Sequence, residues 1–126
     1  MLGKADATPM IAVTDLDRAR RFYEETLGLK TKDEWGEGVT LESGDTAINL
    51  YKSEFAGTNK ATALTFEVDD AEKEVQDLKE KGIFFESYDL PRLQKQGDLY
   101  VAEEGFKTAW FKDPDGNILS LIESSD

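Results

Sequence analysis

The chain contains neither histidine nor cysteine. Their absence excludes Ser-His-Asp and Cys-His catalysis, disulfide bonds, and imidazole or thiolate ligands for zinc, iron or nickel. Any bound metal would have to be a hard cation held by oxygen atoms. General acid–base chemistry would fall to Asp, Glu, Lys or Tyr. These two missing residue types narrow the chemistry more than any residue that is present.

Positive charge and long apolar stretches are also scarce. Fifteen Lys and Arg stand against 27 Asp and Glu, a net charge of −12, which argues against binding to the nucleic-acid backbone. No apolar run approaches the roughly 18 residues of a membrane helix, and the start has no signal-peptide pattern. We therefore expect a cytoplasmic protein with no nucleic-acid or membrane partner. Its acidity keeps it in solution or favours a cationic ligand.

The most informative stretch that is present is AWFKDPDGNILSLIE, residues 109–123. Two apolar runs around a Pro-Asp-Gly turn predict a β-hairpin. Proline presets φ for the first turn position, and Gly116 can take the positive φ that closes a three-residue loop. This loop would place Trp110 opposite Ser120. Their side chains should then share one face of a sheet.

The rest of the chain predicts the order β-α-β-β-β twice. A polar linker over 52–60 separates the halves, and Asp69 with Glu72 resembles a capping box at the second helix. We expect one α+β domain over 1–126, built from repeat modules of about 6–53 and 60–125. Expected strands span 8–13, 29–35, 39–41, 46–51, 61–68, 83–88, 105–112 and 117–123, with a short extended piece at 99–102 and a loop at 89–98.

Two motifs resemble a known family. The run IAVTDLDRARRFY (11–23), followed by Leu27-Gly28-Leu29, looks like the opening of a vicinal oxygen chelate domain, and FKDPDGNIL (111–119) looks like its closing motif. That superfamily includes glyoxalase I, extradiol dioxygenases, fosfomycin-modifying enzymes and bleomycin resistance proteins. The resemblance covers essentially the whole chain. It implies paired βαβββ modules in a curved, open eight-stranded barrel around a central cavity, commonly in a homodimer.

The resemblance also locates the four positions where the family's metal enzymes carry ligands. They fall at Thr8, Asn49, Ala63 and Ser120. None of these side chains is a carboxylate, imidazole or thiolate, so the site has little reason to hold a divalent ion. We therefore expect the family fold without its metal chemistry and without a cofactor.

Several residues could line a ligand cavity, and each has a purely structural alternative. Asn49 and Ser120 could bind a ligand or be satisfied locally. Glu67, on the strand of Ala63, could neutralise a cationic group or be a rim carboxylate in water. Trp110 could be a stacking platform or a packing residue. The full set of cavity candidates is Thr8, Met10, Asn49, Tyr51, Ala63, Glu67, Trp110 and Ser120.

Two functions remain open at this point. One is a metal-independent small-molecule-binding protein, in the manner of the bleomycin resistance proteins that sequester a drug, here a cationic or aromatic ligand. The other is a metal-independent lyase or isomerase of glyoxalase type, with Glu67 or Tyr51 as base. The binding protein is favoured because the sequence shows no paired catalytic groups. Arg18, Arg20 and Arg21 are interpreted as a solvated helix face, pairing with Glu24 and Glu25.

Overall fold

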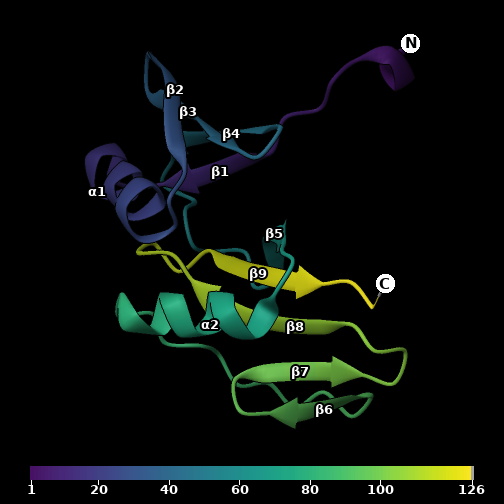
Figure 1. Cartoon of the computed structure of the whole chain (residues 1–126). Helices are drawn as coiled ribbons and strands as arrows, with labels where there is room; N and C mark the ends of the chain where they lie inside the picture. The colour runs from purple at the N-terminus through teal and green to yellow at the C-terminus, as the bar shows by residue number, and fades with distance from the viewer. Residues whose placement is uncertain (126) are drawn as a thin grey trace. The chain divides into compact units, whose positions relative to one another are not determined.

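The computed structural model describes residues 1–125 and divides the chain into two units, Met1–Gly57 and Thr58–Asp126 (Figure 1). Each unit is a mixed β-sheet with one main helix, so the expected α+β class is confirmed. No helix in the described part of the chain is long and apolar enough to cross a membrane.

The first unit follows the predicted order of one strand, one helix and three strands. Its sheet has the order β1-β4-β3-β2, in which β1 runs parallel to β4 and the other pairs are antiparallel. The elements are η1 (Leu2–Lys4), β1 (Met10–Val13), α1 (Leu16–Arg21), the π-helical turn η2 (Phe22–Thr26), β2 (Lys30–Trp35), β3 (Gly38–Ser43) and β4 (Thr46–Lys52).

Local chemistry sets both ends of the first helix. The Asp15 side chain accepts a hydrogen bond from the Arg18 backbone N–H at 3.1 Å, as an N-cap does. Gly28 follows the helical segment with φ of 82°, a conformation that favours glycine. Ala19 and Tyr23 are fully buried, and α1 packs against β3 and β4. These two side chains form the helical part of the core of this unit.

The second unit repeats this topology with one additional strand. Its sheet has the order β5-β9-β8-β7-β6, in which β5 runs parallel to β9 as β1 does to β4. The helix α2 packs against β7, β8 and β9. The elements are β5 (Thr62–Glu67), α2 (Ala71–Glu80), β6 (Leu93–Gln96), β7 (Leu99–Ala102), β8 (Lys107–Lys112) and β9 (Ile118–Glu123).

Two expectations for the segment after α2 are wrong. Residues 83–88 form no strand and make a single bridge, between Phe85 and Phe111, because β7 occupies the position beside the start of β8. Residues 89–98 are not only a loop, since β6 lies within them and forms a hairpin with β7 around Gly97, whose φ is 66°. With β6 the two sheets in the described part of the chain hold nine strands, one more than expected for the paired modules.

The predicted cap of the second helix is also wrong by one residue. The N-cap is Asp70, whose side chain accepts from the Lys73 backbone N–H at 3.1 Å, and not Asp69. Glu123 of β9 accepts a second free N–H, that of Ala71, at 2.8 Å. The start of α2 is therefore held both by its own cap and by the last strand of its sheet.

The closing hairpin forms as predicted. The Asp113 N–H donates to the Asn117 carbonyl and the Gly116 N–H donates to the Asp113 carbonyl, both at 3.0 Å, and Gly116 has φ of 89°. The buried Asp113 carboxylate accepts from the backbone N–H groups of Asp115 and Asn117 and from the Asn117 side-chain amide, at 2.8–3.0 Å. This turn fixes the register of β8 against β9.

Candidate functional site

The face of the second sheet that carries Trp110 and Ser120 is the main candidate surface. The two residues are direct cross-strand partners in the β8–β9 hairpin, which confirms the predicted register. Cross-strand partners project from the same side of a sheet. On β8 and β9 the alternate residues are fully buried, as expected for the side that packs against α2: they are Ala109, Phe111, Leu119 and Leu121.

Trp110 lies between two tyrosines on this face. Its ring is edge-on to Tyr100, with centroids 5.3 Å apart, and edge-on to Tyr88, with centroids 5.5 Å apart. Tyr100 is buried, whereas Tyr88 and Trp110 are partly exposed. Edge-to-face geometry is a preferred arrangement of aromatic pairs and sets the edge of one ring against the face of the other. The partly exposed rings of Trp110 and Tyr88 form an aromatic wall that a ligand could contact.

The Tyr100 hydroxyl also fixes the backbone of Tyr88. It accepts from the Tyr88 N–H at 2.6 Å and donates to the Tyr88 carbonyl at 3.1 Å. The neighbouring Glu86 N–H donates to the Trp110 carbonyl at 2.7 Å. Sequence reasoning missed Tyr88 and Tyr100 as parts of this surface, because residues 83–88 were expected to be an ordinary strand and residues 99–102 only a short extended piece.

Hydrogen bonds within the sheet satisfy the polar groups beside the aromatic cluster. Ser120, only 3% exposed, shares a hydrogen bond with the Thr65 hydroxyl at 2.7 Å. The Trp110 indole N–H donates to the Thr62 hydroxyl at 3.1 Å. The Ser120 position, where the resemblance implies a metal-binding carboxylate, thus holds a neutral hydroxyl engaged within its own sheet.

A β-bulge explains why Thr62 rather than Ala63 reaches Trp110. The register of β5 against β9 shifts between Thr62 and Leu64, so Ala63 has no partner opposite it. Strict alternation from Glu67 and Thr65 would have placed Ala63 on this face. No feature of the sequence marks the bulge.

Glu67 lies at the end of the same strand, beside an open hollow. The hollow has a volume of about 470 Å³ and is lined by Glu67, Val68, Asp69, Phe106, Ile122, Ser124 and Ser125. Glu67 itself is exposed. It occupies the rim position expected of a solvated carboxylate, with an aromatic residue in the same hollow.

The first unit carries a second candidate face, centred on Asn49. Asn49 pairs with Met10 on β1 and with Thr40 on β3. Its side-chain oxygen accepts from the Thr40 hydroxyl at 2.7 Å, and its amide donates to the Met10 sulfur at 3.3 Å. The Asn49 side chain is therefore satisfied by its neighbours, the local alternative weighed from the sequence.

Trp35 extends this face and was missed by sequence reasoning. Its indole N–H donates to the Thr40 hydroxyl at 2.9 Å, and its ring lies over Gly38, where a Cβ atom would collide with it. Tyr51 is the cross-strand partner of Gly38. Because Gly38 has no side chain, the Trp35 ring can pack directly against the backbone there. This contact becomes visible only once the register of β3 and β4 is known.

Thr8 lies apart from these groups. It is exposed and precedes β1, which begins at Met10 rather than at residue 8. The structure therefore brings Met10, Asn49 and Tyr51 together in the first unit, and Ser120 and Trp110 together in the second. Glu67 stands at the end of the second face.

The four positions that the resemblance assigns to metal ligands offer hydroxyl, amide and methyl groups only. Two of them, Asn49 and Ser120, already have hydrogen-bond partners within their own sheets. Residues 1–125 contain no cluster of three or more His, Cys, Asp or Glu placed to hold a metal ion. Taken one by one, none of these four side chains supplies the carboxylate, imidazole or thiolate that divalent cations commonly bind in proteins.

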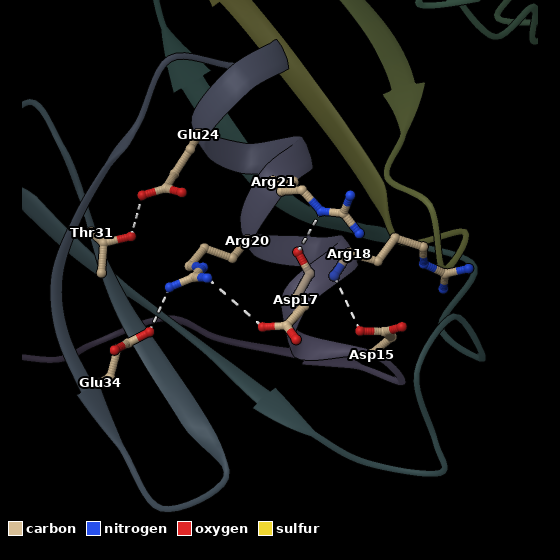
Figure 2. Close-up of polar contacts among 8 residues, drawn as sticks. All are labelled: Asp15, Asp17, Arg18, Arg20, Arg21, Glu24, Thr31 and Glu34. Carbon is tan, nitrogen blue, oxygen red and sulfur yellow. Dashed lines mark hydrogen bonds and ion pairs between the residues drawn. The ribbon is translucent and has the colours of Figure 1, made fainter.

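The charged groups on the first helix have local partners (Figure 2). Arg20 contacts Glu34 of β2 at 2.5 Å and Asp17 at 3.8 Å, so its partners are not Glu24 or Glu25 as expected. Glu24 instead accepts a hydrogen bond from the Thr31 hydroxyl. These contacts join the helix to the edge strand β2 and leave Arg20 half-buried.

Comparisons with known proteins agree with this architecture. A curated relative, the uncharacterized protein YraH of Bacillus subtilis (strain 168), is 28% identical over 130 residues, which cover 90% of this chain and 93% of that protein. The bleomycin resistance determinant encoded on the transposon Tn5 has a similar fold, with a TM-score of 0.74 and 24% identity over 98% of this chain and 100% of that one.

Lactoylglutathione lyase from Agrobacterium tumefaciens shares the same fold, with a TM-score of 0.73 and 18% identity over 96% of this chain and 94% of that one. Residues 7–121 match the family model described as Glyoxalase/Bleomycin resistance protein/Dioxygenase superfamily. Since that match spans nearly the whole chain, the protein belongs to the Glyoxalase/Bleomycin resistance protein/Dioxygenase superfamily.

Proposed function

We propose that the protein binds a small aromatic molecule without a metal ion, on the surface around Trp110. The observation that carries this proposal is the pairing of Trp110 with Ser120. The position implied for a metal-binding carboxylate holds a buried hydroxyl bonded to Thr65, and the residue opposite it is a tryptophan flanked by two tyrosines. Such a surface binds by stacking and apolar contact rather than by metal coordination.

The proposed ligand is planar and carries positive charge. Glu67 lies on the strand of Thr65, two residues further along, and is an exposed carboxylate. A cation is attracted both to the face of an indole ring and to a carboxylate. The proposal extends to sequestration of such a compound by a cytoplasmic homodimer, the mode that the resemblance to bleomycin resistance proteins implies. Sedimentation velocity would test the dimer.

The binding test uses N-methylquinolinium, a planar aromatic cation. We expect it to shift the NMR signal of the Trp110 indole N–H and to raise the melting temperature. Trp110→Ala should abolish the stabilisation, while Trp35→Ala, which alters the face of the first unit, should preserve it. Stabilisation that survives Trp110→Ala would remove this surface from the site.

A separate experiment tests metal independence. Titration with nickel, zinc and manganese should give no stoichiometric binding, because the four family positions offer no anionic donor. Tight uptake of one equivalent of any of these ions would overturn this part of the proposal.

The position of Glu67 favours one alternative, a metal-independent lyase or isomerase. Glu67 borders the 470 Å³ hollow with Phe106 and Ile122, where it could remove a proton next to a carbonyl group. Tyr51 would be the corresponding base in the first unit. Turnover of the methylglyoxal hemithioacetal, lost in Glu67→Gln or Tyr51→Phe, would support the enzyme. The binding proposal predicts no turnover.

A further inference from the structure

Tyr88 carries a polar group that the surrounding contacts leave unexplained. Its ring is partly exposed, yet its hydroxyl oxygen is buried and has no hydrogen-bond partner among residues 1–125. Buried hydroxyl groups in native proteins are nearly always paired, because an unpaired one loses its hydrogen bonds to water. The exception therefore requires a physical account.

The polar groups of the neighbouring Trp110 and Tyr100 side chains have hydrogen-bond partners, which sets the Tyr88 hydroxyl apart. The Trp110 indole N–H is paired with Thr62, and the Tyr100 hydroxyl makes two bonds to the backbone of Tyr88. The backbone of Tyr88 is thus held at both its N–H and its carbonyl, while its own hydroxyl is not held. A fixed backbone with an unpaired side-chain donor suits a residue whose partner comes from outside the chain.

The surroundings also keep this hydroxyl protonated. Burial, the nearby negative charge of Glu86 and the neighbouring Tyr100 raise the pKa of Tyr88 above its usual value near 10.0. The group therefore remains a hydrogen-bond donor at every pH at which a cytoplasmic protein works. Its ring lies edge-on to Trp110, so a molecule stacked on the indole would come within the reach of this side chain.

We propose that Tyr88 determines ligand specificity, by donating a hydrogen bond to an acceptor atom on an aromatic compound stacked at Trp110. The ligand class is the planar aromatic compound of the proposed function with, in addition, a ring nitrogen or carbonyl oxygen whose lone pair accepts a hydrogen bond. Because the ring is partly exposed, a rotation of the side chain on its fixed backbone can bring the hydroxyl to the bound molecule. This inference rests on the proposed binding role of the Trp110 surface.

The first test measures the unliganded protein. Tyr88→Phe removes a hydroxyl that has no partner, so its urea midpoint should equal or exceed that of the wild type. Tyr100→Phe is the matched control, and its midpoint should fall because that hydroxyl makes two bonds. If Tyr88→Phe lowers the midpoint as much as Tyr100→Phe does, the hydroxyl is already satisfied in the protein and the inference is wrong.

The second test uses isoquinoline and naphthalene, two rings of the same shape of which only isoquinoline has an acceptor nitrogen. Binding is followed in weakly alkaline buffer through the Trp110 indole N–H signal. We expect Tyr88→Phe to weaken isoquinoline binding about tenfold and to leave naphthalene binding unchanged. Equal affinity of wild type and variant for isoquinoline would overturn the role of Tyr88 while leaving the Trp110 surface intact. If neither compound shifts the signal while N-methylquinolinium does, the Trp110 surface stands and the role of Tyr88 is overturned. If N-methylquinolinium also gives no shift, the binding surface and this inference fail together.

Discussion

At the scale of single residues, Asp113 shows how one side chain holds a turn. Its buried carboxylate accepts hydrogen bonds from the backbone N–H groups of Asp115 and Asn117 and from the Asn117 side-chain amide. Asp113→Ala leaves these donors without an acceptor, and it should lower the free energy of unfolding by about 1–3 kcal/mol. Urea denaturation measures the change. Asp45→Ala, in an exposed turn, removes the same charge and should have little effect; equal losses would show that charge, not the turn, matters.

Gly38 is the second residue with a specific role. Gly38→Ala places a methyl group where the Trp35 ring lies, so the ring must move away and lose its hydrogen bond to Thr40. We expect a large shift of the Trp35 indole N–H signal and a loss of about 1 kcal/mol in stability. Gly3→Ala is the control, because no atom lies within 4 Å of its added Cβ. An unmoved Trp35 signal would contradict the packing described.

Residue roles could be predicted from the sequence where local chemistry decides them. The Pro-Asp-Gly loop determines a register, and that register placed Trp110 opposite Ser120. The partners Thr62 and Trp35 could not be found in this way. One depends on a bulge without a sequence signal, and the other on a contact between an indole ring and a glycine. Both arise from pairing between strands, and a single sequence does not contain that information.

At the scale of elements, the cap of α2 gives two neighbouring aspartates different roles, because Asp70 caps the helix and Asp69 does not. Asp70→Ala removes the acceptor for the Lys73 N–H and should cost about 1 kcal/mol of stability. Asp69→Ala changes the same charge next to it and should cost much less. Thermal and urea unfolding of the two variants give the comparison. A larger loss in Asp69→Ala would restore the capping box predicted from the sequence.

The helices and most strands were predictable because their apolar spacing is strong. The failures lie in residues 83–98, where edge position overrides local propensity. β6 contributes no fully buried residue and is mostly exposed, so its sequence has the composition of a loop. Residues 83–88 have the composition of a strand, yet β7 already pairs with the start of β8. Position within the sheet, not propensity, decides between these segments.

At the scale of the whole molecule, the negative charge should limit stability. Acidic residues outnumber basic ones two to one in residues 58–126. Raising the ionic strength from about 0.01 M to about 0.15 M shortens the Debye length from roughly 30 Å to roughly 8 Å, which weakens this repulsion. We expect the urea midpoint to rise with added sodium chloride at an unchanged m value. A fall would show that local pairs such as Arg20–Glu34 outweigh the repulsion.

The parallel pairing of β5 with β9 has a consequence for how the protein folds. β5 begins the second unit, but within residues 1–125 the one strand that pairs with it is the last one of that unit. Bringing the two together closes a loop of nearly the full unit, an entropic cost that slows folding. During synthesis β5 therefore waits as an unpaired edge until β9 emerges, whereas all strands of the first unit are already available to pair. The second unit is where we expect the rate-limiting step of folding and the greatest exposure to aggregation.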